Sequence, residues 1–222
     1  MAEATTQPPA GLTRAAEEAG FYHEAGLSAV WVGTRLALGA LSFGFGSFLF
    51  AYFYLRSLNS HGLWYPPSLT HPHLWSGTLI MGLIVVSAAT ATAALQRLKA
   101  GHKADWQRGA TVALVLGLGA AGTQIWDLLN LPFWPGAAGF ASVFTGFYPV
   151  YLFIGLGIMA WLQTLLMRCR AIPQAAFTEQ PHTYIEAFAV QRFQASLSAF
   201  TLTWNYLAAV AVVAWVLFYL IP

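Results

Sequence analysis

Five long apolar runs dominate this sequence and limit what it can fold into. They cover residues 28–55, 74–94, 110–131, 140–167 and 198–221, and none contains more than one charged residue. A transmembrane helix needs about 20 mostly apolar residues, and it pairs its backbone groups within its own segment. The alternating pattern of a barrel strand is absent. The sequence therefore predicts an all-α, polytopic membrane protein with a single domain, a bundle of five transmembrane helices.

The composition excludes a water-soluble globule. Hydrophobic residues make up 58% of the 222 positions and charged residues only 8%, whereas soluble domains carry roughly a quarter charged residues. The net charge of +2 is small, and it gives no argument for binding nucleic acid. Membrane phospholipids are the partners that this composition implies. Dense small residues in the second to fourth runs predict close helix packing, within the chain rather than against a partner.

The basic residues predict an orientation. Because five crossings alternate sides, nine of the ten Lys and Arg residues share the side of the N-terminus. These nine are Arg14, Arg35, Arg97, Lys99, Lys103, Arg108, Arg168, Arg170 and Arg192. Only Arg56 lies opposite. Since basic residues concentrate on the cytoplasmic side, the N-terminus is predicted to be cytoplasmic and the C-terminus periplasmic or external.

Two segments outside the apolar runs are predicted to lie on the cytoplasmic side. Residues 1–27 are polar, contain four Glu residues and lack the apolar core of a secretory signal. We expect them to form a cytoplasmic tail, disordered except for a short surface helix at its end. Residues 168–194 form the longest connection and contain two prolines. We expect an interfacial helix over residues 184–194.

Only two ionisable residues fall inside the predicted spans, and such residues are functional candidates because they are costly in lipid. Arg35 lies about two turns into the first span and can extend its guanidinium to the interface. Asp127 is spaced three residues from both Gln124 and Asn130, which places all three on one helical face. We interpret this face as a structural polar cluster or a contact with a partner subunit. A proton-relay site is the weaker interpretation, because no second buried acid is available.

The sequence predicts no catalytic, cofactor-binding or metal-binding residues. A haem or copper site within a bundle needs imidazoles that project inward from the helices, and all six histidines are expected in loops, at helix ends or in the tail. They are His23, His61, His71, His73, His102 and His182. A single cysteine, Cys169, allows neither an internal disulfide nor a thiolate cluster. His71 and His73 are interpreted as turn residues rather than a surface metal site.

Seven short fragments, in five groups, occur along the chain in a recognisable order. They are AYFYLR ending at Arg56 with the loop WYPP from Trp64, HLWSGTLI from His73 with SAAT from Ser87, QIWD from Gln124, FTGFYPVY ending at Tyr151, and TWNYL from Thr203. Together they resemble the subunit III family of heme–copper (cytochrome c) oxidases, in its five-helix bacterial form. The resemblance covers nearly all five spans, and it rests on the order of the fragments rather than on any one of them.

The chain departs from this family at several positions. Tyr148, Tyr151 and Asn205 stand where the family usually has histidines, and the family's buried glutamate is replaced near Leu41. The family's sites therefore do not carry over. Trp204 keeps the aromatic residue of the last fragment. We retain Tyr148, Tyr151, Trp204 and Asn205 as candidate polar contacts, or as positions that bind lipid or a partner.

The resemblance implies a non-catalytic subunit of a respiratory-chain oxidoreductase in the bacterial cytoplasmic membrane. In this family, subunits I and II hold the haem and copper and reduce oxygen to water with an electron donor such as cytochrome c. Subunit I also pumps protons. Subunit III packs beside it, binds phospholipid and supports the complex. An alternative is an accessory protein of a nitric oxide reductase or another heme–copper enzyme.

Two further classes are less favoured by the residues. A small transporter needs a polar site near the middle of the membrane, whereas Arg35 and Asp127 lie toward opposite ends of their spans. A membrane enzyme with its own cofactor needs inward-facing histidines, which the predicted spans lack.

Overall fold

The regular structure of this chain is helical throughout the part that the computed structural model describes, residues 10–58, 62–178 and 184–221. The elements are α1 (Ala10–Ser57), α2 (Leu74–Lys99), α3 (Lys103–Leu129), α4 (Gly139–Ala171), α5 (Ala175–Thr178), α6 (Tyr184–Trp215) and a final π-helical segment η1 (Val216–Leu220). Five helices are long and apolar enough to cross a membrane: Gly20–Ser57, Leu74–Lys99, Lys103–Leu129, Gly139–Ala171 and Ala189–Leu220. The predicted all-α chain with five candidate transmembrane helices is confirmed.

The helices extend beyond the apolar runs from which they were predicted. α1 begins at Ala10, so residues 10–27 are helical and continuous with the first span; residues 1–9 lie outside the described residues. Residues 184–194 form the first turns of α6 rather than a separate interfacial helix. Apolar composition marks the part of a helix that fits in lipid, about 30 Å, whereas the helix itself continues wherever backbone hydrogen bonds do.

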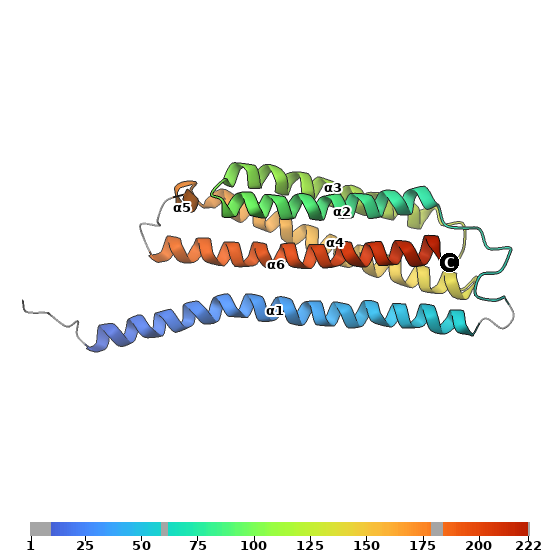
Figure 1. The fold of residues 1–222 in the computed structure, drawn as a ribbon, viewed down its shortest axis with the longest axis horizontal. Coiled ribbons are helices and arrows are strands. Elements are labelled where there is room, and N and C mark those ends of the chain that lie inside the picture. Colours follow the sequence, from blue (N-terminus) through green and yellow to red (C-terminus); the bar gives the residue numbers. More distant parts are fainter. Residues whose placement is uncertain (1–9, 59–61, 179–183, 222) are drawn as a thin grey trace, which may run out of the picture.

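Four helices form the body of the bundle, and the remaining long helix packs against its side. α2 packs on α3 and α6, and α4 packs on α3 and α6. α1 contacts mainly α6 and α4, and Figure 1 shows it along the edge of the bundle opposite α2 and α3. One side of α1 is consequently open along most of its length, and Phe43 on that side is 84% exposed.

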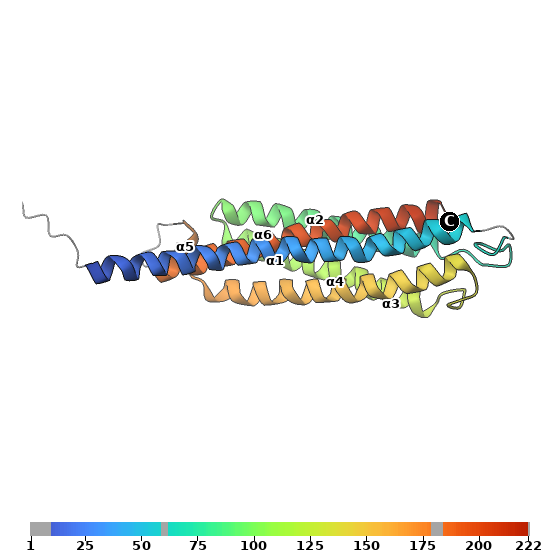
Figure 2. The ribbon, with the colours of Figure 1, turned by 90° about the horizontal axis from the view of Figure 1, so that it is seen from below.

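The two ends of the bundle differ in composition. Figures 1 and 2 place the N-terminal part of α1, the α2–α3 turn, α5 and the start of α6 at one end. We call it the basic end, because Arg97, Lys99, Lys103, Arg108, Arg168, Arg170 and Arg192 lie in these elements or beside them. The opposite end contains residues 62–73, 130–138 and 216–221. We call it the aromatic end after the rings that fill it.

Glycine and alanine allow the helices to pack closely. A Cβ atom added to Gly117 of α3 would lie 2.3 Å from Sδ of Met159 on α4. A Cβ atom on Gly109 of α3 would lie 2.8 Å from the Cβ atom of Ala94 on α2. In lipid, where the hydrophobic effect does not drive helices together, such close approach provides the van der Waals contacts that hold them. At these positions the small residues serve packing within the chain.

Candidate functional site

Asp127 lies on α3 inside the bundle, near the aromatic end, and is completely buried. Its Oδ1 atom is 2.5 Å from Oγ of Ser76 on α2. The Ser76 hydroxyl is also within 2.8 Å of the His73 carbonyl oxygen, and it has only one proton for these two contacts. The Oδ2 atom of Asp127 is buried and has no hydrogen-bond partner among the described residues. The carboxyl group therefore joins α3 to α2 through one oxygen.

Gln124, one turn before Asp127, joins α3 to α4. Its Nε2 atom donates a hydrogen bond of 2.9 Å to the carbonyl oxygen of Tyr148. The hydroxyl of Tyr148 in turn lies 2.8 Å from the hydroxyl of Tyr219 on η1. Tyr219 fits because residue 77 is glycine: a Cβ atom there would lie 2.2 Å from the tyrosine ring. Gln124, Asp127 and Tyr148 thus form one polar cluster with Ser76 and Tyr219.

Asn130 does not join this polar cluster. α3 ends at Leu129, and Asn130 is its C-cap residue. Its side chain is exposed and donates a hydrogen bond of 2.7 Å to the Trp126 carbonyl oxygen. The three-residue spacing predicted one face for Gln124, Asp127 and Asn130, but the chain leaves the helical path before Asn130 can share it.

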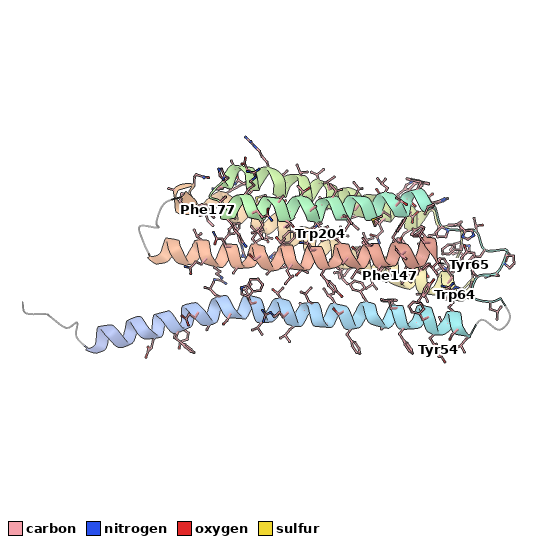
Figure 3. The ribbon with its side chains drawn as sticks, in the orientation of Figure 1. Tyr54, Trp64, Tyr65, Phe147, Phe177 and Trp204 are labelled. Atoms are coloured by element: carbon pink, nitrogen blue, oxygen red, sulfur yellow. The ribbon has the colours of Figure 1, made fainter. Side chains whose placement is uncertain are left out.

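The other residues retained from the family fragments also bond within the chain. Tyr151 is buried on α4 and donates a hydrogen bond of 2.8 Å to the Leu207 carbonyl oxygen of α6. Trp204 projects from α6 towards α2 (Figure 3), where its Nε1 atom donates to Oγ of Ser87 at 3.0 Å. Asn205 is exposed, and its Nδ2 atom donates to Oγ1 of Thr92 at 2.9 Å. Each residue links α6 to a neighbouring helix.

Arg35 lies apart from these residues. It is exposed on α1. The rings of Phe45 on α1 and Tyr206 on α6 have centroids 6.5 Å apart, so these two residues lie at the same depth along the bundle. Ten residues of helix separate Arg35 from Phe45, about 15 Å along the axis, in the direction of the basic end. The structure therefore brings Gln124, Asp127 and Tyr148 together but leaves Arg35 outside the polar cluster.

An apolar groove runs between α1 and α6. Its cavity has a volume of about 290 Å³, and its walls are formed by α1, by Phe147 of α4, and by α6 with η1. Phe147 is labelled in Figure 3. Small residues, among them Gly46 on α1 and Ala209 on α6, leave the space open. The chemistry of this lining suits a hydrocarbon chain rather than a polar substrate.

At the aromatic end, Arg56 of α1 is held by the last residues of the chain. Its Nη1 atom donates a hydrogen bond of 3.0 Å to the Ile221 carbonyl oxygen. The hydroxyl of Tyr52 contacts the same oxygen and donates at 3.0 Å to the Leu217 carbonyl oxygen. The guanidinium of Arg56 lies 5.9 Å from the centre of the Tyr52 ring. The one basic residue predicted to lie opposite the others therefore fastens α1 to η1.

The loop between α1 and α2 covers the same end with aromatic side chains. Trp64 is buried and packs edge-to-face on Tyr52, with ring centroids 5.0 Å apart. Tyr65 stacks on His71 at 4.8 Å, and Figure 3 shows Trp64 and Tyr65 together in this loop. Burial raises the pKa of Tyr65. His61 and His182 lie outside the described residues.

At the basic end, the connections between helices are fastened to each other. The Nζ atom of Lys103 donates to the Ile172 carbonyl oxygen, just after α4. Gln174 donates a hydrogen bond of 3.0 Å to the Gly101 carbonyl oxygen in the α2–α3 turn. Beside these contacts, a cavity of about 410 Å³ lies between α4 and α6 and is lined by Arg168 and Arg192. In the sequence these two arginines indicate only the orientation of the chain. Their shared cavity could not be predicted, because it depends on how α4 packs against α6.

The described residues offer no ligand set for a metal ion. No group of three His, Cys, Asp or Glu side chains comes together among them, and Cys169 is a buried free thiol. Most of the residues selected from the sequence lie instead at helix–helix contacts, namely Gln124, Asp127, Tyr148, Tyr151, Trp204 and Asn205; Arg35 and Asn130 do not.

Comparison with known proteins adds no family to these observations. No protein-family model matches the chain, and no curated protein matches it.

Proposed function

We propose that this chain is the non-catalytic subunit III of a respiratory heme–copper oxidase in a bacterial cytoplasmic membrane, with a cytoplasmic N-terminus and an external C-terminus. Its partners are subunits I and II, which hold the haem and copper and reduce oxygen to water, and its own role is structural and lipid-binding support. One observation carries the proposal: the polar side chains that a membrane enzyme would use for chemistry are instead hydrogen-bonded between helices of this chain.

Three such links support a scaffold. The Asp127–Ser76 contact joins α3 to α2, the Gln124–Tyr148 bond joins α3 to α4, and the Trp204–Ser87 bond joins α6 to α2. These bonds occupy polar groups that would otherwise be free to contact a substrate, although Oδ2 of Asp127 has no partner among the described residues. Inside lipid such bonds add to the packing of small residues.

The positions at which the chain departs from the family fit the same interpretation. Tyr148 and Tyr151 stand where the family usually has histidines, and both hydroxyls bond to the last helical segments, α6 and η1. Tyrosine provides the hydrogen bond and a large apolar ring. These substitutions therefore support a role in assembly, with redox chemistry left to the partner subunits.

The lipid-binding part of the proposal is supported by the apolar groove between α1 and α6. A cavity of about 290 Å³ with hydrocarbon walls accommodates part of an acyl chain. α1 contacts the rest of the bundle mainly along one side, so a chain in this groove would fill the space between α1 and α6.

The test is purification of the native complex. We expect the chain, tagged at its N-terminus and extracted in mild detergent, to co-purify with a haem-bearing subunit whose reduced-minus-oxidised spectrum identifies the haem. A tagged multi-pass membrane protein of similar size and abundance serves as the control for non-specific recovery. Recovery of the chain at full abundance without haem protein would overturn the proposal. The haem type also separates an oxidase from a nitric oxide reductase partner.

A further inference from the structure

The cavity between α4 and α6 at the basic end brings two cationic side chains together. Arg168 comes from the last turn of α4 and Arg192 from α6, and both line a space of about 410 Å³. The rest of the lining is mostly apolar, with Leu165, Ile172 and Phe193 among it. Two arginine side chains from different helices therefore line one cavity whose remaining wall is mostly apolar.

Neither guanidinium is neutralised by the chain in the part that the structure describes. The ion pair found there joins Arg108 to Asp105, at 3.8 Å, and involves neither Arg168 nor Arg192. Both side chains are exposed, so solvent screens their mutual repulsion, but each of them attracts an anion that enters the cavity. Arginine presents several donors in a planar fork that matches the oxygens of a phosphate group.

Helix dipoles do not account for the pair. A cation in the last turn of α4 is favourable there, so the dipole accounts for Arg168 but not for Arg192. Arg192 lies more than one turn inside α6, which begins at Tyr184. The dipole effect fades within the first turn, and near an N-terminus it opposes a cation. The position of Arg192 in this cavity therefore needs a different explanation.

We propose that this cavity binds the phosphate group of an anionic phospholipid, with Arg168 and Arg192 as the ligands. The cavity lies where the candidate span Gly139–Ala171 ends, the level at which headgroups meet a membrane protein. Ala171 and Ile172 also line the cavity, and their accessible surface gives the adjoining part of an acyl chain an apolar wall. Because a free phosphate ion gains nothing from such a wall, the lining favours a lipid. This inference deepens the lipid-binding part of the proposed function and names the chemical class of one lipid.

The experiment measures lipid binding to the full-length chain in vesicles and nanodiscs. The probes are phosphatidylcholine alone and phosphatidylcholine mixed with phosphatidylglycerol. Native mass spectrometry counts the phosphatidylglycerol retained after detergent washing, and a fluorescent phosphatidylglycerol gives its dissociation constant. We expect retention in the unaltered chain and binding about tenfold weaker or more in R168Q/R192Q, because charge-assisted hydrogen bonds are lost.

A matched variant separates the cavity from the general charge of the basic end. R97Q/R170Q removes the same charge from two exposed arginines of α2 and α4 that do not line the cavity, and it should bind as the unaltered chain does. Equal weakening in both double variants, or no preference for phosphatidylglycerol in the unaltered chain, overturns the proposal. Displacement by inorganic phosphate at similar concentration overturns the lipid assignment.

R168Q/R192Q could fail to fold, which its helicity would reveal. A second measurement therefore tests the proposal without any substitution. In the unaltered chain, phenylglyoxal modification of Arg168 and Arg192, mapped by mass spectrometry, should be slowed by phosphatidylglycerol and unaffected by phosphatidylcholine. Equal modification in both lipids overturns the proposal. The vesicles and nanodiscs contain this chain without any haem protein, so these results do not depend on the co-purification test. The lipid site and the assignment as subunit III can therefore fail separately.

Discussion

Arginine serves opposite purposes at the two ends of this bundle. At the aromatic end, Arg56 donates to the Ile221 carbonyl oxygen and lies over the Tyr52 ring. At the basic end, Arg168 and Arg192 are exposed and face a shared cavity without a hydrogen bond or ion pair in the part of the chain that the structure describes. The same side chain is thus a structural link in one place and an unpaired cation in the other.

The difference follows from the acceptors within reach. The last carbonyl groups of a helix lack partners in the helix, and at the aromatic end those of η1 lie beside Arg56 and Tyr52. At the basic end, Lys103 donates to the Ile172 carbonyl oxygen, and no carbonyl oxygen of the described residues accepts a hydrogen bond from Arg168 or Arg192. We therefore expect substitutions at the aromatic end to lower the free energy of unfolding, and substitutions of Arg168 and Arg192 to change binding.

The largest loss of stability is expected from Phe144→Ala. This ring is completely buried near the aromatic end and stacks on Tyr148, with ring centroids 4.1 Å apart. Removing it should lower the free energy of unfolding by about 3–5 kcal/mol, measured from the loss of helicity in mixed micelles. Phe43→Ala, at a ring that is 84% exposed on α1, is the control. Equal losses would show that the aromatic end is not a packed core.

A smaller loss is expected from Gly77→Ala. The new methyl group would lie within 2.2 Å of the Tyr219 ring and would push that ring away from Tyr148. Such overpacking should cost about 1–3 kcal/mol by the same unfolding measurement. Gly122→Ala is matched to it, because nothing lies within 4 Å of a Cβ atom there. Equal stability of the two variants would contradict the close packing of α2 against η1.

Tyr219→Phe isolates the hydrogen bond from the packing. It keeps the ring and removes the hydroxyl that lies 2.8 Å from the Tyr148 hydroxyl. The cost should be about 1–2 kcal/mol, because a buried hydroxyl is left without its partner. Tyr54→Phe, on the exposed face of α1, should leave unfolding unchanged. If Tyr219→Phe is neutral, water replaces the bond and the polar cluster is less tightly closed than the contacts indicate.

The smallest effects directly compare the two ends. Arg56→Gln should lower the free energy of unfolding by about 1 kcal/mol, because the bond to the Ile221 carbonyl oxygen is lost. Arg168→Gln, measured in micelles without anionic lipid, should change it by less than about 0.5 kcal/mol, as surface substitutions do. A larger cost at Arg168 than at Arg56 would reverse the contrast between the ends.

The candidate residues show how far local spacing reaches. Gln124 and Asp127 are three residues apart on one helix, so their shared face was predictable, and both are buried. The same spacing predicts that Asn130 shares this face, but Asn130 caps the helix. The prediction fails there because composition marks the end of a helix poorly. The bond between Tyr148 and Tyr219 joins positions far apart in sequence, and no local pattern indicates it.

The sequence by itself determined the class of structure, the five apolar helices and the gathering of basic residues towards one end. These follow from length and hydropathy, which act residue by residue along the chain. The tertiary structure decided which polar groups are paired and which are left open, because pairing depends on the helices that lie side by side. Arg56 meets the end of η1, whereas Arg168 and Arg192 line the same cavity. In sequence all three are basic residues near the end of an apolar run; only packing gives them different roles.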